Sequence, residues 1–252
     1  MIDLHSHILP NIDDGAASVE TSLEMAMAAV SDGIVAIAAT PHVRDDYLTS
    51  PAEMEQAVES LRAVLAEAAV PLQVLTGGEI ALDMLPELDD EDLRRFGLGG
   101  NPSFLLLETP YLGWPLGLEE TLLQLRVRGF DVLLAHPERN TEVQEDPGRL
   151  TQLVETGTLV QLTAAAVDGR LGPNAQRTSL RLIDLALAHV LACDAHAPRV
   201  RKIGLQAAVR ELGDPELAHW MTNAVPAAIV AGSEIPQRPR RERRRARRRL
   251  RR

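Results

Sequence analysis

Short apolar runs alternate with longer helical patterns along most of the chain, and this alternation limits the folds that the sequence can adopt. Strands are expected at Met1–Leu4 and at six later runs, 35–39, 72–75, 104–107, 132–135, 159–162 and 190–193. These runs are almost continuously apolar, as in parallel sheets that helices cover on both faces. About seven strand and helix units predict an α/β fold in which the sheet closes into a barrel.

Two of the intervening helices carry recognisable patterns. Residues 18–31 are expected to form the first helix, with an apolar stripe of Leu23, Ala26, Met27 and Val30. Ser50 and Glu53 form a capping box around Pro51, which is typical of a helix start. The helix that begins there is expected to face the core through Val58, Leu61 and Leu65.

Residues that commonly bind metal ions follow most of the predicted strands. His5 and His7 come directly after the first strand, and side chains at i and i+2 of a strand point to the same side. The C-terminal ends of the strands are where α/β barrels build their active sites, so these residues are expected to converge. The full predicted set is His5, His7, Asp14, His42, Glu79, Glu108, His136, Asp194 and His196.

Five imidazoles and four carboxylates exceed the four to six ligands that one ion takes, so a cluster of two or three ions is expected. Glu79 and Asp194 are candidates to bridge between ions. A nitrogen and oxygen ligand set without thiolate suits manganese, iron, zinc or cobalt and, less well, magnesium. Cys193 precedes Asp194 by one residue, so on a strand it should face the other way and lie in the core.

A cluster of ions can supply a metal-bound hydroxide and stabilise both the attacking and the leaving oxygen in a displacement at phosphorus. Such a site also needs donors for the remaining phosphate oxygens, and arginine matches them with a planar fork. Arg139 and Arg201 are the predicted phosphate-binding residues, with Arg199 as the alternative to Arg201. Three loop aromatics, Tyr47, Tyr111 and Trp114, are expected near the site, either to stack on a substrate ring or as plain packing.

Composition sets outer limits on the class of protein. With 252 residues and 45% hydrophobic content, the chain has ample material for a core. One cysteine, and no apolar run of signal-peptide or membrane-span length, lead us to expect a soluble cytoplasmic protein. The net charge of −10 is uneven, because residues 238–252 contain eleven arginines and one acid. We therefore predict a catalytic domain over 1–237 and a disordered Arg-rich tail over 238–252.

The order of the motifs resembles the PHP (polymerase and histidinol phosphatase) superfamily, and more closely its bacterial capsule and exopolysaccharide tyrosine phosphatases. The resemblance runs from Met1 to about Ile235. It implies a distorted (β/α)7 TIM-like barrel, a manganese-preferring centre, and removal of phosphate from the phosphotyrosine tail of a membrane-associated tyrosine autokinase. It also implies three ligand sets: His5, His7, Glu79 and Asp194; Glu79, Glu108 and His136; and Asp14, His42 and His196.

Other functions remain open from the sequence. Members of the same superfamily act on histidinol phosphate or nucleotides, so the substrate is the least transferable property. An amidohydrolase-type metalloenzyme also begins with His-x-His, but many of these need a mid-chain carboxylated lysine, and the one lysine here is Lys202. The Arg-rich tail would attract nucleic acid or an anionic membrane weakly and without specificity, or would be a solvated extension with no such role.

Overall fold

The structure is a computed structural model that describes residues 1–196 and 202–240. Its strands are β1 (Ile2–Ser6), β2 (Ala36–Ala39), β3 (His42–Arg44), β4 (Tyr47–Leu48), β5 (Gln73–Leu75), β6 (Glu79–Ala81), β7 (Phe104–Glu108), β8 (Asp131–Ala135), β9 (Leu159–Thr163) and β10 (Val190–Ala192). Its α-helices are α1 (Val19–Ser31), α2 (Pro51–Glu67), α3 (Asp90–Arg95), α4 (Leu118–Val127), α5 (Thr141–Glu145), α6 (Thr151–Glu155), α7 (Ala164–Val167), α8 (Pro173–Asp184), α9 (Gln206–Leu212), α10 (Pro215–His219) and α11 (Val225–Ala231).

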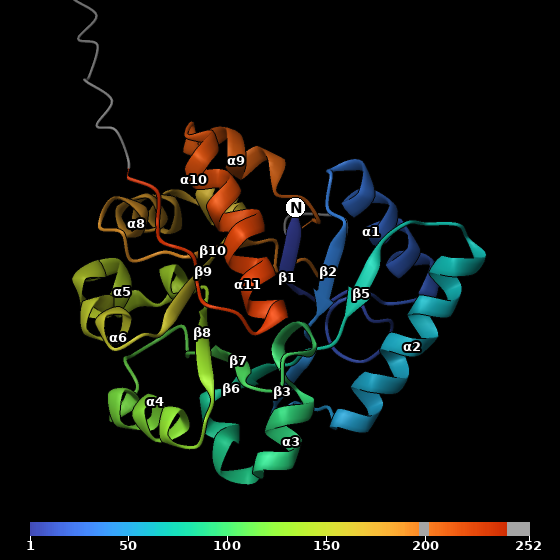
Figure 1. Ribbon diagram of the computed structural model, residues 1–252, viewed down its shortest axis with the longest axis horizontal. Helices are drawn as coiled ribbons and strands as arrows, with labels where there is room; N and C mark the ends of the chain where they lie inside the picture. Colours follow the sequence, from blue (N-terminus) through green and yellow to red (C-terminus); the bar gives the residue numbers. More distant parts are fainter. Residues whose placement is uncertain (197–201, 241–252) are drawn as a thin grey trace, which may run out of the picture.

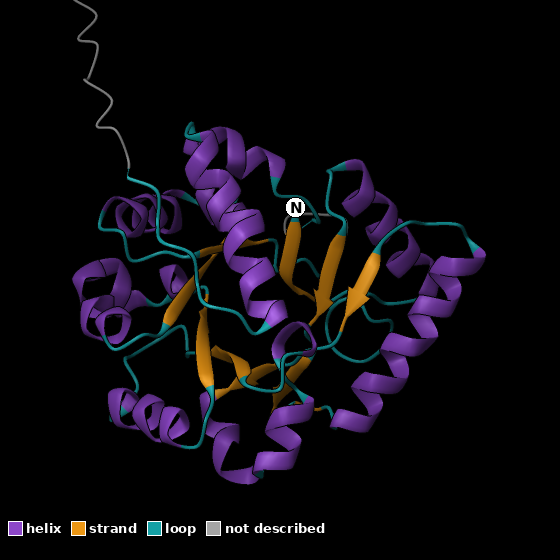
Figure 2. Cartoon of the chain, in the orientation of Figure 1, coloured by secondary structure: helices purple, strands orange, loops and turns teal. Residues whose placement is uncertain are grey.

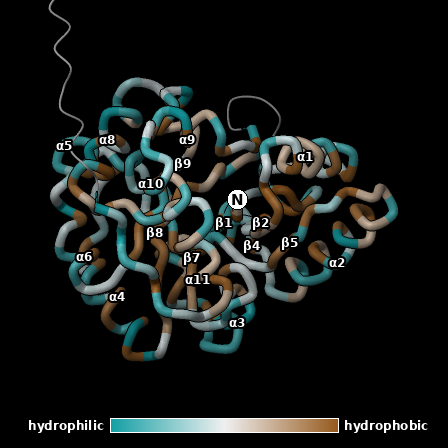
Figure 3. Tube along the Cα trace, turned by 45° about the horizontal axis from the view of Figure 1, so that its top comes forward, coloured by the Kyte–Doolittle hydropathy of each residue, from teal (hydrophilic) through white to brown (hydrophobic). Residues whose placement is uncertain are grey.

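The strands lie in the interior and the helices surround them (Figures 1 and 2). All the strand pairs are parallel except β3 with β4. This is the arrangement that the alternating strand and helix pattern predicted. Apolar residues are concentrated on the strands and on the inner sides of the helices (Figure 3). The long capped helix α2 begins with the predicted capping box, and Val58, Leu61 and Leu65 are buried.

The predicted α/β organisation is present, but the strands form two hydrogen-bonded sheets instead of one closed barrel. One sheet has the order β1-β2-β5 and the other β10-β9-β8-β7-β6-β3-β4. Two chain segments pass from the first sheet to the second, β2 to β3 through Pro41 and β5 to β6 through Gly77 and Gly78. Proline lacks the N–H that a sheet ladder needs, and glycine weakens a strand, so these breaks have a local cause.

The two sheets also meet at the far end of the strand order. The backbone N–H of Asp194 donates to the carbonyl of His5 at 2.8 Å, and that of His7 donates to the carbonyl of Ala195 at 2.9 Å. A parallel bridge pairs Ser6 with Ala195. The segment after β10 therefore lies directly beside the end of β1, which brings residues near the start of the chain and residues around Asp194 to one site.

The face that α1 buries differs from the predicted stripe. Met25, Ala26 and Ala29 are buried, whereas the side chain of Met27 is 49% exposed. The small alanine side chains allow the helix to lie close to its neighbours, and a hydropathy pattern gives more weight to methionine than to alanine. The prediction of the helix itself is confirmed, with Ser18 as its N-cap.

The C-terminal residues that the structure describes lie against the folded body. The indole N–H of Trp220 donates to the carbonyl of Pro236 at 2.9 Å, and Arg238 lies over the Trp220 ring at 5.3 Å. Arg238 also donates to the carbonyl of Ile183 at 3.0 Å, near the end of α8. Within the predicted tail of residues 238–252, the part from residue 241 onward lies outside the described residues.

Across residues 1–196 and 202–240, we find no helix with both the length and the apolar character needed to cross a membrane.

Candidate metal centre

The structure brings all nine predicted ligands to one place. His5 is the second-last residue of β1, which ends at Ser6, and Glu108 is the last residue of β7. His42 and Glu79 follow shortly after the ends of β2 and β5, as expected, and are also the first residues of the short strands β3 and β6. Donor atoms within 4.8 Å of one another form three groups: His7, Asp14, His42 and His196; His5, Glu79, His136 and Asp194; and His42, Glu79 and Glu108.

Four donor atoms in the interior have the spacing of a shared coordination sphere. The Nε2 atoms of His5 and His7 are 3.3 Å apart, and each lies 3.3 Å from Glu79 Oε2. Asp194 Oδ1 is 3.4 Å from His5 Nε2 and 3.3 Å from His7 Nε2. Donors placed tetrahedrally at about 2.0–2.1 Å from one ion lie about 3.3–3.4 Å from each other. This set is the first of the three that the family resemblance implied.

The outer set also corresponds to the implied division, and Glu108 of the middle set lies between two histidines. Asp14 Oδ1 lies 3.4 Å from His42 Nε2 and 3.3 Å from His196 Nε2. Glu108, however, is about as far from His136 Nε2, at 3.9 Å, as from His42 Nδ1, at 4.0 Å. His136 Nε2 forms a hydrogen bond with Glu79 Oε1 at 2.7 Å, which places these two members of the implied middle set side by side.

The donor chemistry fits a metal centre. His42 Nδ1 and Glu79 Oε2 are 2.9 Å apart, yet neither has a hydrogen-bond partner among the described residues. Buried polar atoms without partners are costly, and a cation between them would satisfy both. Cys193 is 1% exposed and its thiol approaches the carbonyl of His5 at 3.5 Å, so the set contains no thiolate, as predicted.

Burial and mutual charge shift the pKa values of these groups strongly. Burial acts to lower the pKa of His5, but the carboxylates of Glu79 and Asp194 outweigh it and raise the pKa. Burial would raise the pKa of Glu79, but the adjacent histidines hold it well below its usual range. Burial, with repulsion from Glu79, raises the pKa of Glu108 to about 7. Burial, with the charge of Arg139, lowers the pKa of His136 to about 4, which favours the neutral imidazole that a metal requires.

Two supporting residues hold the inner histidines in place. Asp13 Oδ2 lies 2.7 Å from His7 Nδ1, and Gln161 Oε1 lies 3.0 Å from His5 Nδ1, which leaves both Nε2 atoms facing the centre. Neither Asp13 nor Gln161 is among the nine ligands predicted from the sequence. The one indication for Gln161 is that it is an amide within the buried strand Leu159–Thr163.

Backbone constraints around the site are tight. A Cβ on Gly15 would lie 2.2 Å from the carbonyl oxygen of His7, so the turn after Asp14 packs against His7 only with glycine there. His136 and Asp194 have φ angles of 31° and 47°, in the left-handed region that residues other than glycine rarely occupy. Such strain persists where the surrounding fold enforces it and is concentrated at functional sites.

The two predicted arginines have different outcomes. Arg139 reaches the centre: its guanidinium forms an ion pair with Asp194 and donates to Thr163 Oγ1 at 2.7 Å. Arg201, and its alternative Arg199, lie outside the described residues. An arginine that sequence reasoning did not name, Arg44, lies 4.0 Å from Glu108 Oε2 while it binds Asp46 at 2.6 Å.

Two of the three predicted aromatics lie at the site. The Tyr47 ring stacks on His42 with centroids 5.9 Å apart, and the Tyr111 hydroxyl accepts a hydrogen bond from Arg139 at 3.4 Å. Trp114 lies beneath Arg149, at 5.4 Å from its guanidinium, which fits the packing alternative. Tyr47 and Tyr111 are therefore the two aromatic side chains placed to approach a substrate.

Comparison with known proteins identifies relatives of this chain. The family model for capsular polysaccharide synthesis, CpsB/CapC, matches residues 1–216. The chain is 38% identical over 228 residues to the tyrosine-protein phosphatase YwqE of Bacillus subtilis (strain 168), covering 88% of this chain and 89% of YwqE. It is 30% identical over 201 residues to the putative tyrosine-protein phosphatase CapC of Staphylococcus aureus, covering 78% of this chain and 77% of CapC.

A solved structure extends the likeness to three dimensions. It comes from a study of YwqE from Bacillus subtilis and CpsB from Streptococcus pneumoniae, described as unique metal-dependent tyrosine phosphatases. It matches with a TM-score of 0.86 and 33% identity, over 96% of this chain and 100% of the other. The arrangement of the nine ligands thus occurs in a fold shared with metal-dependent phosphatases, and the chain belongs to the CpsB/CapC family.

Proposed function

We propose that the protein is a metal-dependent tyrosine-protein phosphatase that hydrolyses the phosphate ester of phosphotyrosine. The observation that carries this is the convergence of nine ligands beside Arg139, in a chain whose relatives are named tyrosine-protein phosphatases. We further propose two or three manganese ions as the resident metal. The substrate that we propose is the phosphotyrosine tail of a membrane-associated tyrosine kinase, in cytoplasmic control of capsule or exopolysaccharide synthesis.

The residues have separable roles in this proposal. The three imidazole and carboxylate sets hold the metal, which when bound supplies Lewis acidity and makes water nucleophilic near neutral pH. Arg139 binds the non-bridging phosphate oxygens, since its fixed position beside Asp194 requires no reordering when substrate arrives. Arg201 is proposed as a second residue that donates hydrogen bonds to the phosphate. Tyr111 positions Arg139 through its hydroxyl.

We also propose that the two sheets act as one distorted barrel of seven units within a catalytic domain of residues 1–237. The continuity of β2 into β3 and of β5 into β6, with the bridge from Ser6 to Ala195, supports this arrangement. Residues 238–252 are proposed to be a disordered tail except at its start, where Arg238 contacts Trp220 and Ile183. An amidohydrolase reaction is less favoured, since Lys202 is exposed and lines a pocket with Asp32 and Asp168, none of which is a proposed ligand.

The test is hydrolysis of p-nitrophenyl phosphate and of a phosphotyrosine peptide with added manganese. We expect a chelator to abolish both activities and manganese to restore them. His136→Ala should lower activity by more than about 100-fold, because loss of a ligand exceeds the 10–100-fold typical of residues that only support ligands. His219→Ala is the matched control, because His219 is exposed on α10 and should leave activity intact.

Full activity after complete removal of metal would refute the metal-dependent mechanism. If the same assay showed a strong preference for histidinol phosphate or a nucleotide over phosphotyrosine, the proposed substrate would be wrong. The proposed reaction, metal-dependent hydrolysis of a phosphate ester, would still hold.

A further inference from the structure

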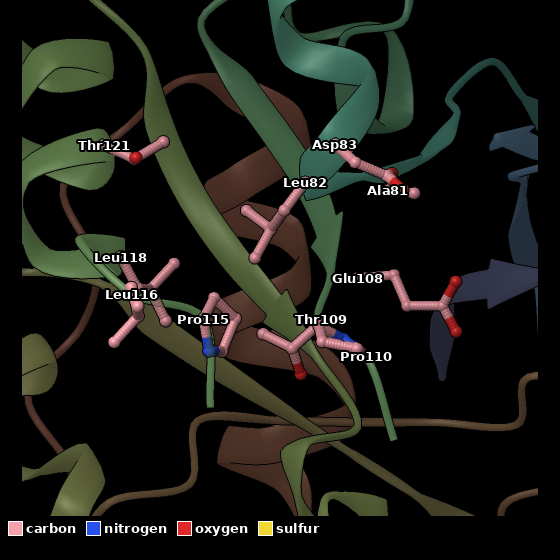
Figure 4. A pocket seen from close by; sticks show the side chains of 10 residues that line it. All are labelled: Ala81, Leu82, Asp83, Glu108, Thr109, Pro110, Pro115, Leu116, Leu118 and Thr121. Carbon is pink, nitrogen blue, oxygen red and sulfur yellow. The ribbon is translucent and has the colours of Figure 1, made fainter. Parts of the chain in front are cut away.

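A pocket of about 380 Å³ lies beside the metal centre (Figure 4). Ala81 at the end of β6 and Glu108 at the end of β7 lie on its inner side, and Thr121 on α4 lies on its outer side. Most of its wall is apolar, from Leu82, Pro110, Pro115, Leu116 and Leu118. A pocket of this volume is large enough to accept an apolar side chain, and its apolar wall favours a hydrophobic occupant.

The charges of the pocket exclude a second phosphate group. Asp83 and Glu108 are the charged side chains among the described residues that line it, and both are acids. An anionic occupant would therefore meet repulsion, with no arginine, lysine or histidine in the lining to offset it. The pocket is thus complementary to a neutral, apolar group and differs in kind from the phosphate-binding side of the centre.

The pocket is continuous with the proposed phosphatase site. Glu108 belongs to both, and its carboxylate extends away from Leu116, Leu118 and Thr121 toward the interior (Figure 4). Pro110, in the lining, is followed by Tyr111, whose hydroxyl binds Arg139. Because Glu108 belongs both to the pocket wall and to the donor cluster, an occupant of the pocket would lie next to the metal centre. A flanking residue of the same peptide satisfies this geometry, since an extended chain advances about 3.3–3.6 Å per residue.

One lining residue of the pocket is an exposed apolar side chain. Leu116 is 101% exposed, and Leu112, which is 76% exposed, lies two residues beyond the lining residue Pro110 in the sequence. Exposed apolar side chains grouped at a pocket commonly mark binding sites.

We propose that this pocket binds an apolar side chain that flanks the phosphotyrosine, so that the enzyme selects phosphotyrosines with apolar and not acidic neighbours. The inference rests on the proposed phosphatase function. It adds that the pocket recognises a part of the peptide substrate other than the phosphate group. Recognition by alternate pockets along an extended peptide is a known means of sequence selection.

The test uses the full chain with manganese and three phosphotyrosine peptides that differ in flanking residues: glycine, leucine or glutamate. p-Nitrophenyl phosphate serves as the reference substrate, because it has no flanking residue. For the unmodified protein, we expect kcat/KM to be about tenfold higher with leucine than with glycine, equivalent to about 1.4 kcal/mol. The peptide with glutamate should be the poorest substrate.

Thr121→Trp, which fills the outer end of the pocket, should remove the preference for leucine over glycine. Leu116→Ala serves as a second variant whose folding is not at risk, because Leu116 is fully exposed, and it should reduce the preference. Leu123→Trp is the matched control, since Leu123 is 61% exposed on α4 but does not line this pocket, and it should keep the full preference.

The outcomes separate the two proposals. Equal kcat/KM for the three peptides, or an equal loss on every substrate in Thr121→Trp, would overturn the flanking-residue inference; the second result would assign the pocket to the phosphotyrosine ring. Absence of turnover on all four substrates in the metal-loaded protein would instead refute the proposed function.

Discussion

The inner and outer parts of the candidate metal centre differ in how the fold holds them. The inner group, His5, Glu79, His136 and Asp194, is buried throughout. The outer group contains Asp14, whose side chain is 41% exposed and which lies in the loop after β1. His196 and His42 lower the pKa of Asp14 below its usual range, so this carboxylate is charged but within reach of water. We infer that the inner positions are preorganised and that the outer ones exchange with solvent more easily.

Matched Asp→Asn substitutions at the two positions test this difference and should give the largest effects. Asp194→Asn should lower kcat/KM by more than about 100-fold, because it removes an inner ligand and leaves the buried Arg139 without its ion-pair partner. Asp14→Asn should cost about 10–100-fold, since water can replace an exposed ligand. Elemental analysis of the purified variants should show a larger loss of metal in Asp194→Asn.

Circular dichroism of both variants controls for folding. Equal losses of activity and of metal in two folded variants would remove the distinction between inner and outer positions. A larger loss in Asp14→Asn would reverse it.

The pair His5 and His7 was the part of the site that the sequence predicted best. These histidines are two residues apart at the end of β1, and side chains at i and i+2 of a strand point to the same side, so the sequence spacing alone placed them together. Periodicity is informative where the backbone is regular. It was less informative at His42 and Glu79, which begin new strand segments after Pro41 and Gly78, because a break within a strand leaves no clear periodic pattern.

What the sequence could not supply depends on side-chain contacts between distant segments. The proximity of His136 to Glu79, 57 residues away, follows from a hydrogen bond and not from a local pattern. Met27 on α1 is exposed because close packing favoured the neighbouring alanines. Gln161 was overlooked for a related reason: its strand provides no ligand, and its role is visible only through His5, 156 residues away.

Gln161 therefore offers an intermediate test of the inner group. Gln161→Leu keeps a buried strand residue of similar length but removes the Oε1 acceptor from His5 Nδ1. We expect metal affinity to fall by about 10–100-fold, as for other residues that orient a metal-binding histidine. Titration with manganese, followed by activity, measures the shift. Gln152→Leu on α6 is the control, because Gln152 is exposed and distant from the centre.

Added manganese at high concentration should restore much of the activity of Gln161→Leu, since the nine ligands remain. An unchanged manganese titration would show that His5 is held well enough by its strand alone. A loss that no manganese concentration reverses would instead point to damage to the sheet.

The smallest effect is expected at Cys193, which lies next to the inner ligand Asp194 but faces the core. Its backbone N–H donates to Asp3 Oδ1 at 3.1 Å and its thiol approaches the carbonyl of His5 at 3.5 Å. Burial, with the adjacent Asp3 carboxyl, raises the pKa of this thiol well above its usual range, which disfavours the thiolate form that a nucleophile needs. Cys193→Ser conserves volume and keeps a donor to His5, so kcat/KM should stay within about twofold. A folded, metal-loaded variant without activity would contradict the metal-dependent mechanism, because it would require sulfur in the reaction.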